Sequence, residues 1–270
     1  MAVVALEKLS PAISTLTLNR PERLNAMNFQ LVGELHDALD QVAADTECKV
    51  VILTGAGRAF CAGLDLRETG RPPAIGEHHR INKAIDGQAF MSNLTVHLRQ
   101  TPQIVIAAVR GPAFGGGLAI ACGCDVRIAS STARFCSAFI RTGLTGTDIG
   151  ISYLLPQLVG ASRAADLIFS GREIDAAAAE RMGLVSEVVP DEELMPSAMA
   201  YADMVAAHTH TGLVLTKEVL WHNVDSTSMP AAIAIENRNQ SLAMTSPDVK
   251  AHMALYSERV AKAPRPEANN

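Results

Sequence analysis

Two apolar segments that run into turns of small residues constrain this chain more than any other feature. The first covers residues 60–66, Phe-Cys-Ala-Gly-Leu-Asp-Leu, and the second covers residues 109–118, Val-Arg-Gly-Pro-Ala-Phe-Gly-Gly-Gly-Leu. Glycine lets backbone N–H groups approach a ligand at positions where a Cβ atom would collide with it. Two such turns can direct two backbone donors at one oxygen atom, which is the arrangement of an oxyanion hole. The sequence therefore predicts a site that polarises a carbonyl group through main-chain hydrogen bonds.

Charge and composition argue against several classes of function. The 270 residues carry a formal net charge of −5, which argues against binding to nucleic acid or to an anionic membrane surface. The sequence offers no run for membrane insertion, and residues 1–11 lack the pattern of a signal peptide. The five cysteines have no framework spacing, so we expect reduced, buried thiols in a cytoplasmic protein. Cys122 and Cys124 lack a second pair with metal-ligand spacing, and no metal site is predicted.

The order of predicted elements indicates an α/β chain with a helical C-terminal part. Strands alternate with helices as far as residue 190, and the continuous apolar strands 50–54 and 104–109 are typical of a sheet covered on both faces. Beyond residue 190 the patterns predict helices alone. We therefore assign residues 1–190 to an α/β core and residues 191–262 to a helical region that packs on the core or on a partner subunit. Residues 263–270 are predicted to be disordered, and the sequence contains no internal repeat.

Five stretches of the sequence, taken together, resemble the enoyl-CoA hydratase/isomerase (crotonase) superfamily. They are residues 18–27 (LNRPERLNAM), 60–66, 109–118, 124–129 and 181–185, in the family order. The resemblance implies a crotonase-like α/β spiral of ββα units with a C-terminal helical region that forms a homotrimer, or a dimer of trimers. It also implies an acyl-CoA substrate, a place in fatty acid metabolism, and no cofactor beyond the coenzyme A of the substrate.

The resemblance also assigns roles to particular residues. The backbone N–H groups of Leu64 and Gly116 match the family's oxyanion hole, which would hold the thioester oxygen and stabilise an enolate. The positions that the resemblance places around the substrate are Arg23, Ala26, Ala62, Gly63, Gly115, Phe139 and Arg141. The turn at residues 23–26 and the region of Ala62 would border the CoA nucleotide. Arg23 is then a candidate phosphate contact, and its alternative interpretation is a solvated arginine in a turn.

The chain departs from the family's hydratases at both catalytic glutamates. In those enzymes one carboxylate activates water and the other protonates carbon, so both must flank the substrate. The matching positions here are Ala119 and Phe139. Neither side chain can move a proton. The usual hydratase mechanism therefore does not carry over to this chain.

Asp148 is the candidate for the missing acid/base group. It lies in residues 143–150, Gly-Leu-Thr-Gly-Thr-Asp-Ile-Gly, which resemble the segment where dienoyl-CoA isomerases carry an aspartate. Coenzyme A dehalogenases place a nucleophilic aspartate in a similar segment. The alternative interpretation is structural, because aspartate is favoured as the N-cap of a helix and one is predicted from Ile149. Arg141 would either pair with Asp148 or contact the ligand.

Three functions follow from these residues. The favoured one is an enzyme that hydrates an enoyl-CoA or shifts its double bond, with Asp148 moving the proton. Isomerisation fits at least as well as hydration, because it needs one acid/base group and the sequence offers one. The second is an acyl-CoA-binding protein that has lost proton transfer. The third is a specialised reaction such as dehalogenation, with Asp148 as the nucleophile.

Overall fold

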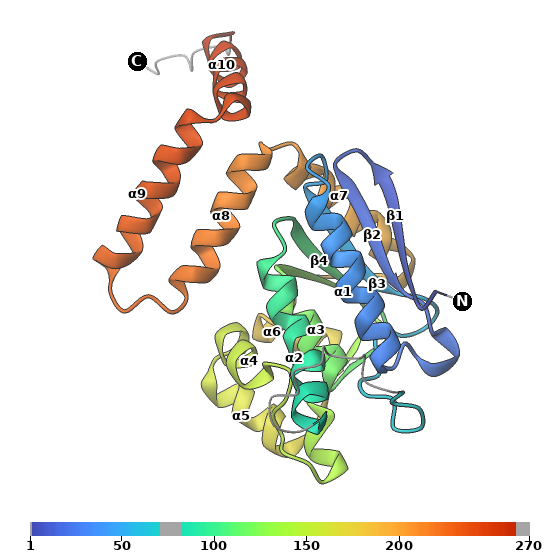
Figure 1. The fold of residues 1–270 in the computed structure, drawn as a ribbon. Coiled ribbons are helices and arrows are strands. Elements are labelled where there is room, and N and C mark those ends of the chain that lie inside the picture. Colours follow the sequence, from blue (N-terminus) through green and yellow to red (C-terminus); the bar gives the residue numbers. More distant parts are fainter. Residues whose placement is uncertain (1, 71–82, 263–270) are drawn as a thin grey trace, which may run out of the picture. The chain divides into compact units, whose positions relative to one another are not determined.

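The computed structural model describes residues 2–70 and 83–262, and the chain divides into two compact units, Met1–Val205 and Ala206–Asn270 (Figure 1). The first unit includes all but the last residue of helix α7 (Leu194–Ala206), which the sequence analysis assigned to the C-terminal helical region. This helix buries Leu194, Ala198 and Ala202, which share one face because they are four residues apart. The division between the two units falls at the last residue of α7, and the assignment of residues 191–262 to a separate helical region stays a prediction.

The larger sheet of the first unit has six strands in the order β1-β2-β3-β4-β6-β9. Its members are β1 (Val4–Ser10), β2 (Ile13–Leu18), β3 (Val50–Gly55), β4 (Ile104–Val109), β6 (Val126–Ser130) and β9 (Glu187–Val189). The β1–β2 pair is antiparallel and every other pair is parallel. In β3, Val50, Val51, Ile52 and Leu53 are all fully buried, so this strand is covered on both faces as its continuous apolar sequence predicts.

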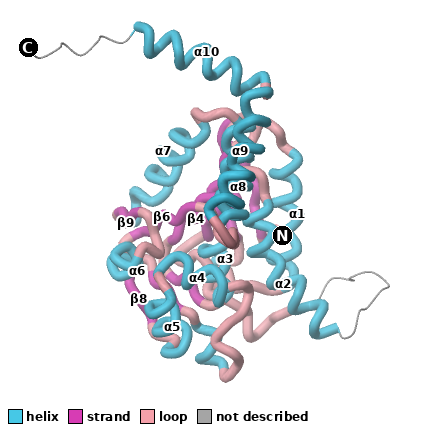
Figure 2. The backbone as a smooth tube through the Cα atoms, turned by 90° about the vertical axis from the view of Figure 1, so that its left-hand side faces the viewer, coloured by secondary structure: helices cyan, strands magenta, loops and turns pink. Residues whose placement is uncertain are grey.

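The first unit also contains a second, smaller layer of strands. Its sheet contains β5 (Pro112–Phe114), β7 (Arg134–Cys136) and β8 (Glu173–Asp175), in that order. The structure also has two isolated parallel bridges. One joins Met27 to Leu64, and the other joins Cys61 to Ala113. In Figure 2 the labelled strands β4, β6 and β9 cross the middle of the first unit, whereas most of β1, at the edge of the large sheet, is exposed.

Four successive units follow one plan, in which a strand of the large sheet leads to a short segment of the small layer and then to a helix. The helices of these units are α1 (Phe29–Ala44), α2 (Lys83–Gln100), α3 (Gly116–Gly123) and α4 (Ile151–Val159). This is the spiral of ββα units that the resemblance implies, and the predicted α/β class is confirmed. The plan is invisible as a sequence repeat, because it depends on the order of strand, turn and helix rather than on particular residues.

The remaining helices of the first unit are α5 (Ala161–Ser170), α6 (Ala176–Met182) and the short 3-10 helices η1 (Pro21–Arg23), η2 (Ala138–Thr142) and η3 (Asp191–Glu193). The predicted start of α1 is confirmed, because the Asn28 side chain accepts a hydrogen bond from the Leu31 N–H at 2.8 Å. Leu31, Leu35, Leu39 and Val42 form the buried face of α1, as their spacing predicts.

All five cysteines are free and buried, as the sequence predicts. Burial raises the pKa of the Cys61 thiol to about 12 and that of Cys122 to about 11, so both stay protonated near neutral pH. No helix in the described ranges is long and apolar enough to cross a membrane. A cytoplasmic location stays a prediction.

The second unit is helical, with α8 (His210–Asn223), α9 (Met229–Thr245) and α10 (Pro247–Lys262). Asp248, near the start of α10, accepts hydrogen bonds from the Thr211 N–H of α8 and from the Ser246 hydroxyl. The bond from Thr211 connects the first and last helices of the unit. The tail predicted at 263–270 lies outside the described residues. One chain is described, so the homotrimer or dimer of trimers stays a prediction.

Candidate functional site

The two glycine turns lie side by side, because they occupy the same place in successive units of the spiral. The Phe114 N–H donates to the Cys61 carbonyl oxygen at 3.0 Å. A Cβ atom at Gly63 would lie 2.8 Å from the Phe114 carbonyl oxygen and 3.6 Å from the Gly116 nitrogen. At Gly117, a Cβ atom would collide with the Cys61 carbonyl oxygen. Backbone packs directly on backbone here, which only glycine allows at these positions.

The backbone N–H groups of Leu64 and Gly116 are both available to a ligand. The Met27 N–H donates to the Gly63 carbonyl oxygen at 2.7 Å, and the Asp65 N–H donates to the Met27 carbonyl oxygen at 2.8 Å. This parallel pairing turns the intervening Leu64 N–H away from Met27. Gly116 is the first residue of α3, where an N–H group has no acceptor within the helix. Neither N–H has an acceptor among the described residues.

Both glycine turns open into a cavity of about 560 Å³ in the first unit. Its apolar side chains are those of Met27, Phe29, Ala62, Leu64, Leu66, Met91, Ala138, Phe139, Leu144 and Ile149. The polar side chains along it belong to Thr69, Gln88, Arg141, Thr142 and Asp148. A mostly apolar pocket with a few polar groups is typical of a small-molecule site. Among its described lining residues, Asp148 carries the one carboxylate.

The structure brings most of the predicted site residues to this cavity. Ala62, Gly63, Leu64, Gly115, Gly116, Phe139, Arg141 and Asp148 line it. Neither Arg23 nor Ala26 is among its lining residues. Arg23 is the last residue of η1, and Ala26 lies three residues after it. Ala119 is fully buried in α3 and does not line the cavity. Phe139 does line it, and its ring comes within 3.8 Å of the Cβ position at Gly115.

Asp148 is held by two donors on the same oxygen. Its Oδ1 accepts a hydrogen bond from the Gln88 side-chain amide at 2.6 Å and another from the Ile149 N–H at 2.7 Å. The interpretation of Asp148 as a helix N-cap is wrong, because α4 begins at Ile151 and its N-cap is Gly150. The predicted helix started too early since Ile149 has a φ of 49°, which is left-handed backbone and not helical.

Arg141 points its charge away from Asp148. Its Nε donates to the Gly171 carbonyl oxygen at 2.7 Å, and its Nη1 contacts the Glu173 carboxylate at 3.1 Å. The pairing with Asp148 that the sequence left open does not occur. Arg141 still lines the cavity, so a ligand contact through this exposed side chain stays a prediction.

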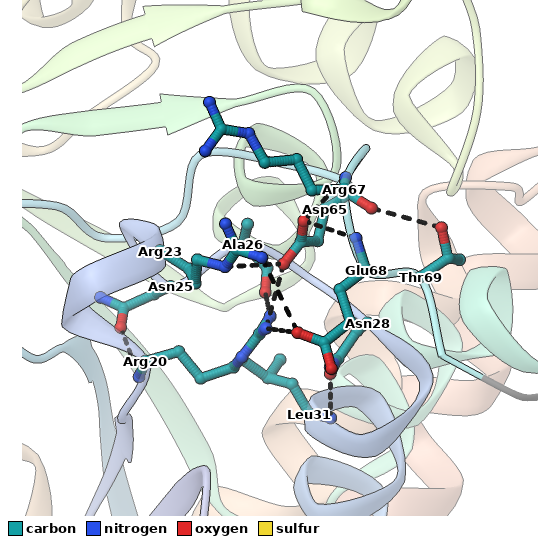
Figure 3. A network of polar contacts seen from close by, with 10 residues as sticks. All are labelled: Arg20, Arg23, Asn25, Ala26, Asn28, Leu31, Asp65, Arg67, Glu68 and Thr69. Atoms are coloured by element: carbon teal, nitrogen blue, oxygen red, sulfur yellow. Dashed lines mark hydrogen bonds and ion pairs between the residues drawn. The ribbon is translucent and has the colours of Figure 1, made fainter.

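A buried ion pair anchors the turn that carries Leu64 (Figure 3). The Asp65 carboxylate accepts hydrogen bonds from the N–H groups of Arg67 and Glu68, both at 3.0 Å, and from the Arg20 guanidinium at 3.0 Å. Arg20 and Asp65 have side-chain exposures of only 7% and 4%. Burial alone would raise the pKa of Asp65, but these hydrogen bonds outweigh it and lower that pKa below its usual value. Asp65 is therefore a structural anion.

The Arg23 guanidinium lies close to two carboxylates of the same network. Its Nε lies 3.7 Å from the Asp65 carboxylate, and its Nη2 lies 3.8 Å from the Glu68 carboxylate. In Figure 3 the Arg23 side chain points toward Asp65, whereas the Arg67 side chain extends away from it. Arg23 is 29% exposed, so it remains within reach of a ligand from solvent. Its role as a phosphate contact stays a prediction.

Three residues that support the site have no assigned role in the sequence analysis. Arg20 pairs with Asp65, Gln88 binds Asp148, and Thr95 donates to the Ile149 carbonyl oxygen at 3.2 Å. Gln88 and Thr95 share a helix face with Met91, and this spacing is a signal that the sequence does contain. Nothing in the sequence marks Arg20, whose partner lies 45 residues further along the chain.

The described residues contain no group of three His, Cys, Asp or Glu side chains that could hold a metal ion. The two main-chain N–H groups and the Asp148 carboxylate lie along the same apolar cavity.

Comparison with known proteins identifies the family of this chain. Residues 8–263 match the family model described as enoyl-CoA hydratase/isomerase. A relative from Mycobacterium tuberculosis, named probable enoyl-CoA hydratase EchA12, is 42% identical over 240 residues, covering 89% of this chain and 84% of the relative.

Two solved structures extend the likeness to three dimensions. A probable enoyl-CoA hydratase/isomerase from Mycobacterium abscessus has a TM-score of 0.86 and 35% identity, covering 96% of this chain and 97% of the other. A monofunctional enoyl-CoA isomerase from M. smegmatis has a TM-score of 0.73 and 39% identity, covering 86% of this chain and 99% of the other. The chain belongs to the enoyl-CoA hydratase/isomerase family.

Proposed function

We propose that this enzyme moves the double bond of an enoyl-CoA thioester, with Asp148 as its acid/base group. The observation that carries the proposal is the shared cavity, where Asp148 is the one carboxylate among the described lining residues and the N–H groups of Leu64 and Gly116 lie at the glycine turns. The relative named a monofunctional enoyl-CoA isomerase supports the same reaction class.

The proposed reaction needs one proton acceptor that becomes a proton donor. The Leu64 and Gly116 N–H groups hold the thioester oxygen of a 3-enoyl-CoA. The Asp148 carboxylate removes a proton from C2, and the electrons of the C2–H bond delocalise into a dienolate whose negative oxygen these N–H groups stabilise. Protonated Asp148 then returns the proton to C4. The double bond moves from C3–C4 to C2–C3, with no gain or loss of atoms.

Hydration has less support from these residues. It requires activation of a water molecule and protonation of carbon, which family hydratases divide between two carboxylates. Ala119 is buried without reaching the cavity, and the Phe139 ring lies close to the Gly115 turn. An apolar ring at this place disfavours an ordered nucleophilic water.

The proposal includes an acyl-CoA substrate and its orientation. The acyl chain occupies the apolar cavity, and the coenzyme A portion runs past Ala62 toward Arg23 and Ala26. Arg23 supports this direction, because it is part exposed and lies outside the acyl cavity. No cofactor beyond the substrate's coenzyme A takes part.

The test is turnover of 3-hexenoyl-CoA and 3-decenoyl-CoA, followed through the absorbance of the conjugated 2-enoyl product. Hydration is measured separately, as the loss of that absorbance from trans-2-enoyl-CoA. Asp148→Asn is expected to lower isomerisation by about 10²–10⁴-fold, the usual contribution of a general acid/base, with acyl-CoA affinity unchanged. Asp166→Asn is the matched control, because this exposed carboxylate pairs with Arg172 outside the cavity.

Each other outcome selects another function. Full turnover in the Asp148→Asn variant excludes Asp148 as the base. Wild-type protein that binds acyl-CoA and turns over no enoyl-CoA is a binding protein. A covalent acyl–Asp148 species in mass spectrometry identifies Asp148 as a nucleophile.

A further inference from the structure

We propose that Gln88 is a positioning residue, which fixes the Asp148 carboxylate by occupying its Oδ1 atom and leaves Oδ2 to exchange protons with the substrate. The inference rests on the proposed acid/base role of Asp148. It adds a residue of helix α2 that acts through Asp148, and it specifies which carboxylate oxygen carries the proton.

The hydrogen bonds to Asp148 are unevenly distributed over its two oxygens. Oδ1 accepts from the Gln88 amide at 2.6 Å and from the Ile149 N–H at 2.7 Å. Within the described residues, Oδ2 accepts from no protein group. Two donors on one oxygen, from different directions, fix the rotation of the carboxylate. The oxygen that remains is the one that can take a proton from a ligand without breaking a bond to the protein.

Glutamine suits this position because its side-chain amide donates a hydrogen bond and does not titrate. A lysine or histidine here would add a charge or a competing proton. Gln88 itself lines the cavity and is exposed. Its hydrogen bond therefore contributes little to the stability of the fold, since loss of an exposed hydrogen bond leaves groups that water can satisfy. The contact is better explained by the orientation of Asp148 than by stability.

The helix that carries Gln88, α2, is held in place by buried side chains. Met91, Leu94 and Leu98 follow Gln88 on the inner side of this helix, and Leu94 and Leu98 are fully buried. Two turns beyond Gln88, the Thr95 hydroxyl lies 3.2 Å from the Ile149 carbonyl oxygen and 3.0 Å from the Ser92 carbonyl oxygen, and its one proton is shared between them. The helix therefore holds the Asp148 segment at two successive residues, once by the side chain of Asp148 and once by the backbone of Ile149.

The backbone at Ile149 shows that the surroundings impose this geometry. Its φ of 49° lies in the left-handed region, which a β-branched residue rarely adopts. The Ile149 side chain is buried, and its Cδ1 lies 3.0 Å from the Cβ position at Gly116. The strained residue thus connects the two functional parts, because it donates to Asp148 and packs on the glycine turn.

The experiment compares Gln88→Met with Gln100→Met in the full-length protein, using 3-hexenoyl-CoA as the probe. Both changes replace an exposed glutamine of α2 by a side chain of similar length, but Gln100 does not line the cavity. Gln88→Met is expected to lower kcat about 10- to 100-fold, with KM within about two-fold, because the base is misoriented rather than removed. Gln100→Met is expected to keep wild-type kcat and KM.

A double-mutant cycle then tests whether Gln88 acts through Asp148. The Gln88→Met change is expected to cause no further loss when Asp148→Asn is already present. Gln88→Glu adds a readout that a purely structural role would not move. A carboxyl group donates only while protonated, and the adjacent Asp148 carboxylate should raise the pKa of the introduced carboxyl above the usual glutamate value, so the kcat of this variant should decline relative to wild type as the pH rises from about 4 to about 8. The Gln88→Met variant should show no such decline.

The failures of the two proposals are distinguishable. If Asp148→Asn keeps wild-type turnover, the proposed function fails and the positioning role fails with it. If Asp148→Asn is inactive while Gln88→Met keeps wild-type kcat, the positioning role is wrong and the proposed function stands. If Gln88→Met raises KM and leaves kcat unchanged, Gln88 binds substrate directly and does not position Asp148.

Discussion

The turn that carries Leu64 and the segment that carries Asp148 face the same cavity but are built differently. The Leu64 turn is fixed by a buried ion pair, by bonds to main-chain N–H groups and by backbone packing against the second glycine turn. The Asp148 segment is exposed over much of its length, and two hydrogen bonds hold its carboxylate. The Leu64 N–H, proposed to polarise the ligand, therefore belongs to a turn anchored by buried groups, whereas the group proposed to move the proton lies in a largely exposed loop.

The difference has a physical reason. Main-chain donors stabilise a developing charge well only when they are already in place, so any displacement of the turn reduces the effect. A proton, by contrast, can reach the same carbon atom from any carboxylate at suitable distance. The chain follows this division. It has both glycine turns, it has Ala119 and Phe139 where the resemblance places the two hydratase glutamates, and it has Asp148 elsewhere on the cavity wall.

Loss of the buried ion pair is expected to have the largest effect. Arg20→Met leaves the Asp65 carboxylate buried without its guanidinium partner, which typically costs about 3–5 kcal/mol of unfolding free energy. Arg23→Met is the matched control, because its partly exposed guanidinium lies 3.7 Å from the same carboxylate and should contribute less than about 1 kcal/mol. Urea unfolding of the two variants measures both values. Equal stability of the two would show that the anchor of the Leu64 turn lies elsewhere.

Displacement of the glycine turn is expected to have the next largest effect. Gly63→Ala places a Cβ atom 2.8 Å from the Phe114 carbonyl oxygen, at a φ of 92° that alanine disfavours. The turn must shift, and loss of one well-placed oxyanion donor lowers kcat by about 10²–10³-fold. Gly143→Ala has a similar φ of 80° and nothing within 4 Å of its Cβ position, so it separates backbone strain from the clash. Unchanged kcat in Gly63→Ala would contradict the oxyanion role of this turn.

The same contrast determines what the sequence could predict. The proximity of the Leu64 and Gly116 turns was predictable, because an apolar strand followed by glycines is a local signal and the family resemblance placed the two turns together. Strands β5 and β8 were not predicted, since three residues are too few for a periodic pattern. The surroundings of Asp148 were also beyond the sequence, because Gln88 lies 60 residues away and contacts it only when α2 and the loop meet.

A fall in pH is expected to weaken helix α2, which holds Asp148, before it weakens the Leu64 turn. This effect is expected to be smaller than those of the Arg20 and Gly63 substitutions. His36 of α1 and His97 of α2 share a hydrogen bond of 2.8 Å between their Nδ1 atoms, so one ring must be neutral. Burial and the neighbouring His97 lower the pKa of His36, and they outweigh the opposing effects of the Phe90 carbonyl oxygen, Asp40 and Asp37. A lowered pKa in the folded state means that this contribution is present above about pH 6.5 and is lost as the pH falls through the folded-state value. About 0.5–1.5 kcal/mol of support for α2, the net value of one hydrogen bond, should then disappear, and the protection of its amides, measured against the rate of an unstructured chain at the same pH, should fall a few-fold. The Leu64 turn should stay protected over the same range, because its anchor Asp65 has a pKa below the usual aspartate value and keeps its charge.

Hydrogen exchange at pH 7 and pH 5 measures both regions, with His36→Gln as a variant that cannot titrate at this position. If α2 and the Leu64 turn lose protection together, or if His36→Gln retains the full pH response, the two sides of the cavity are not independently anchored.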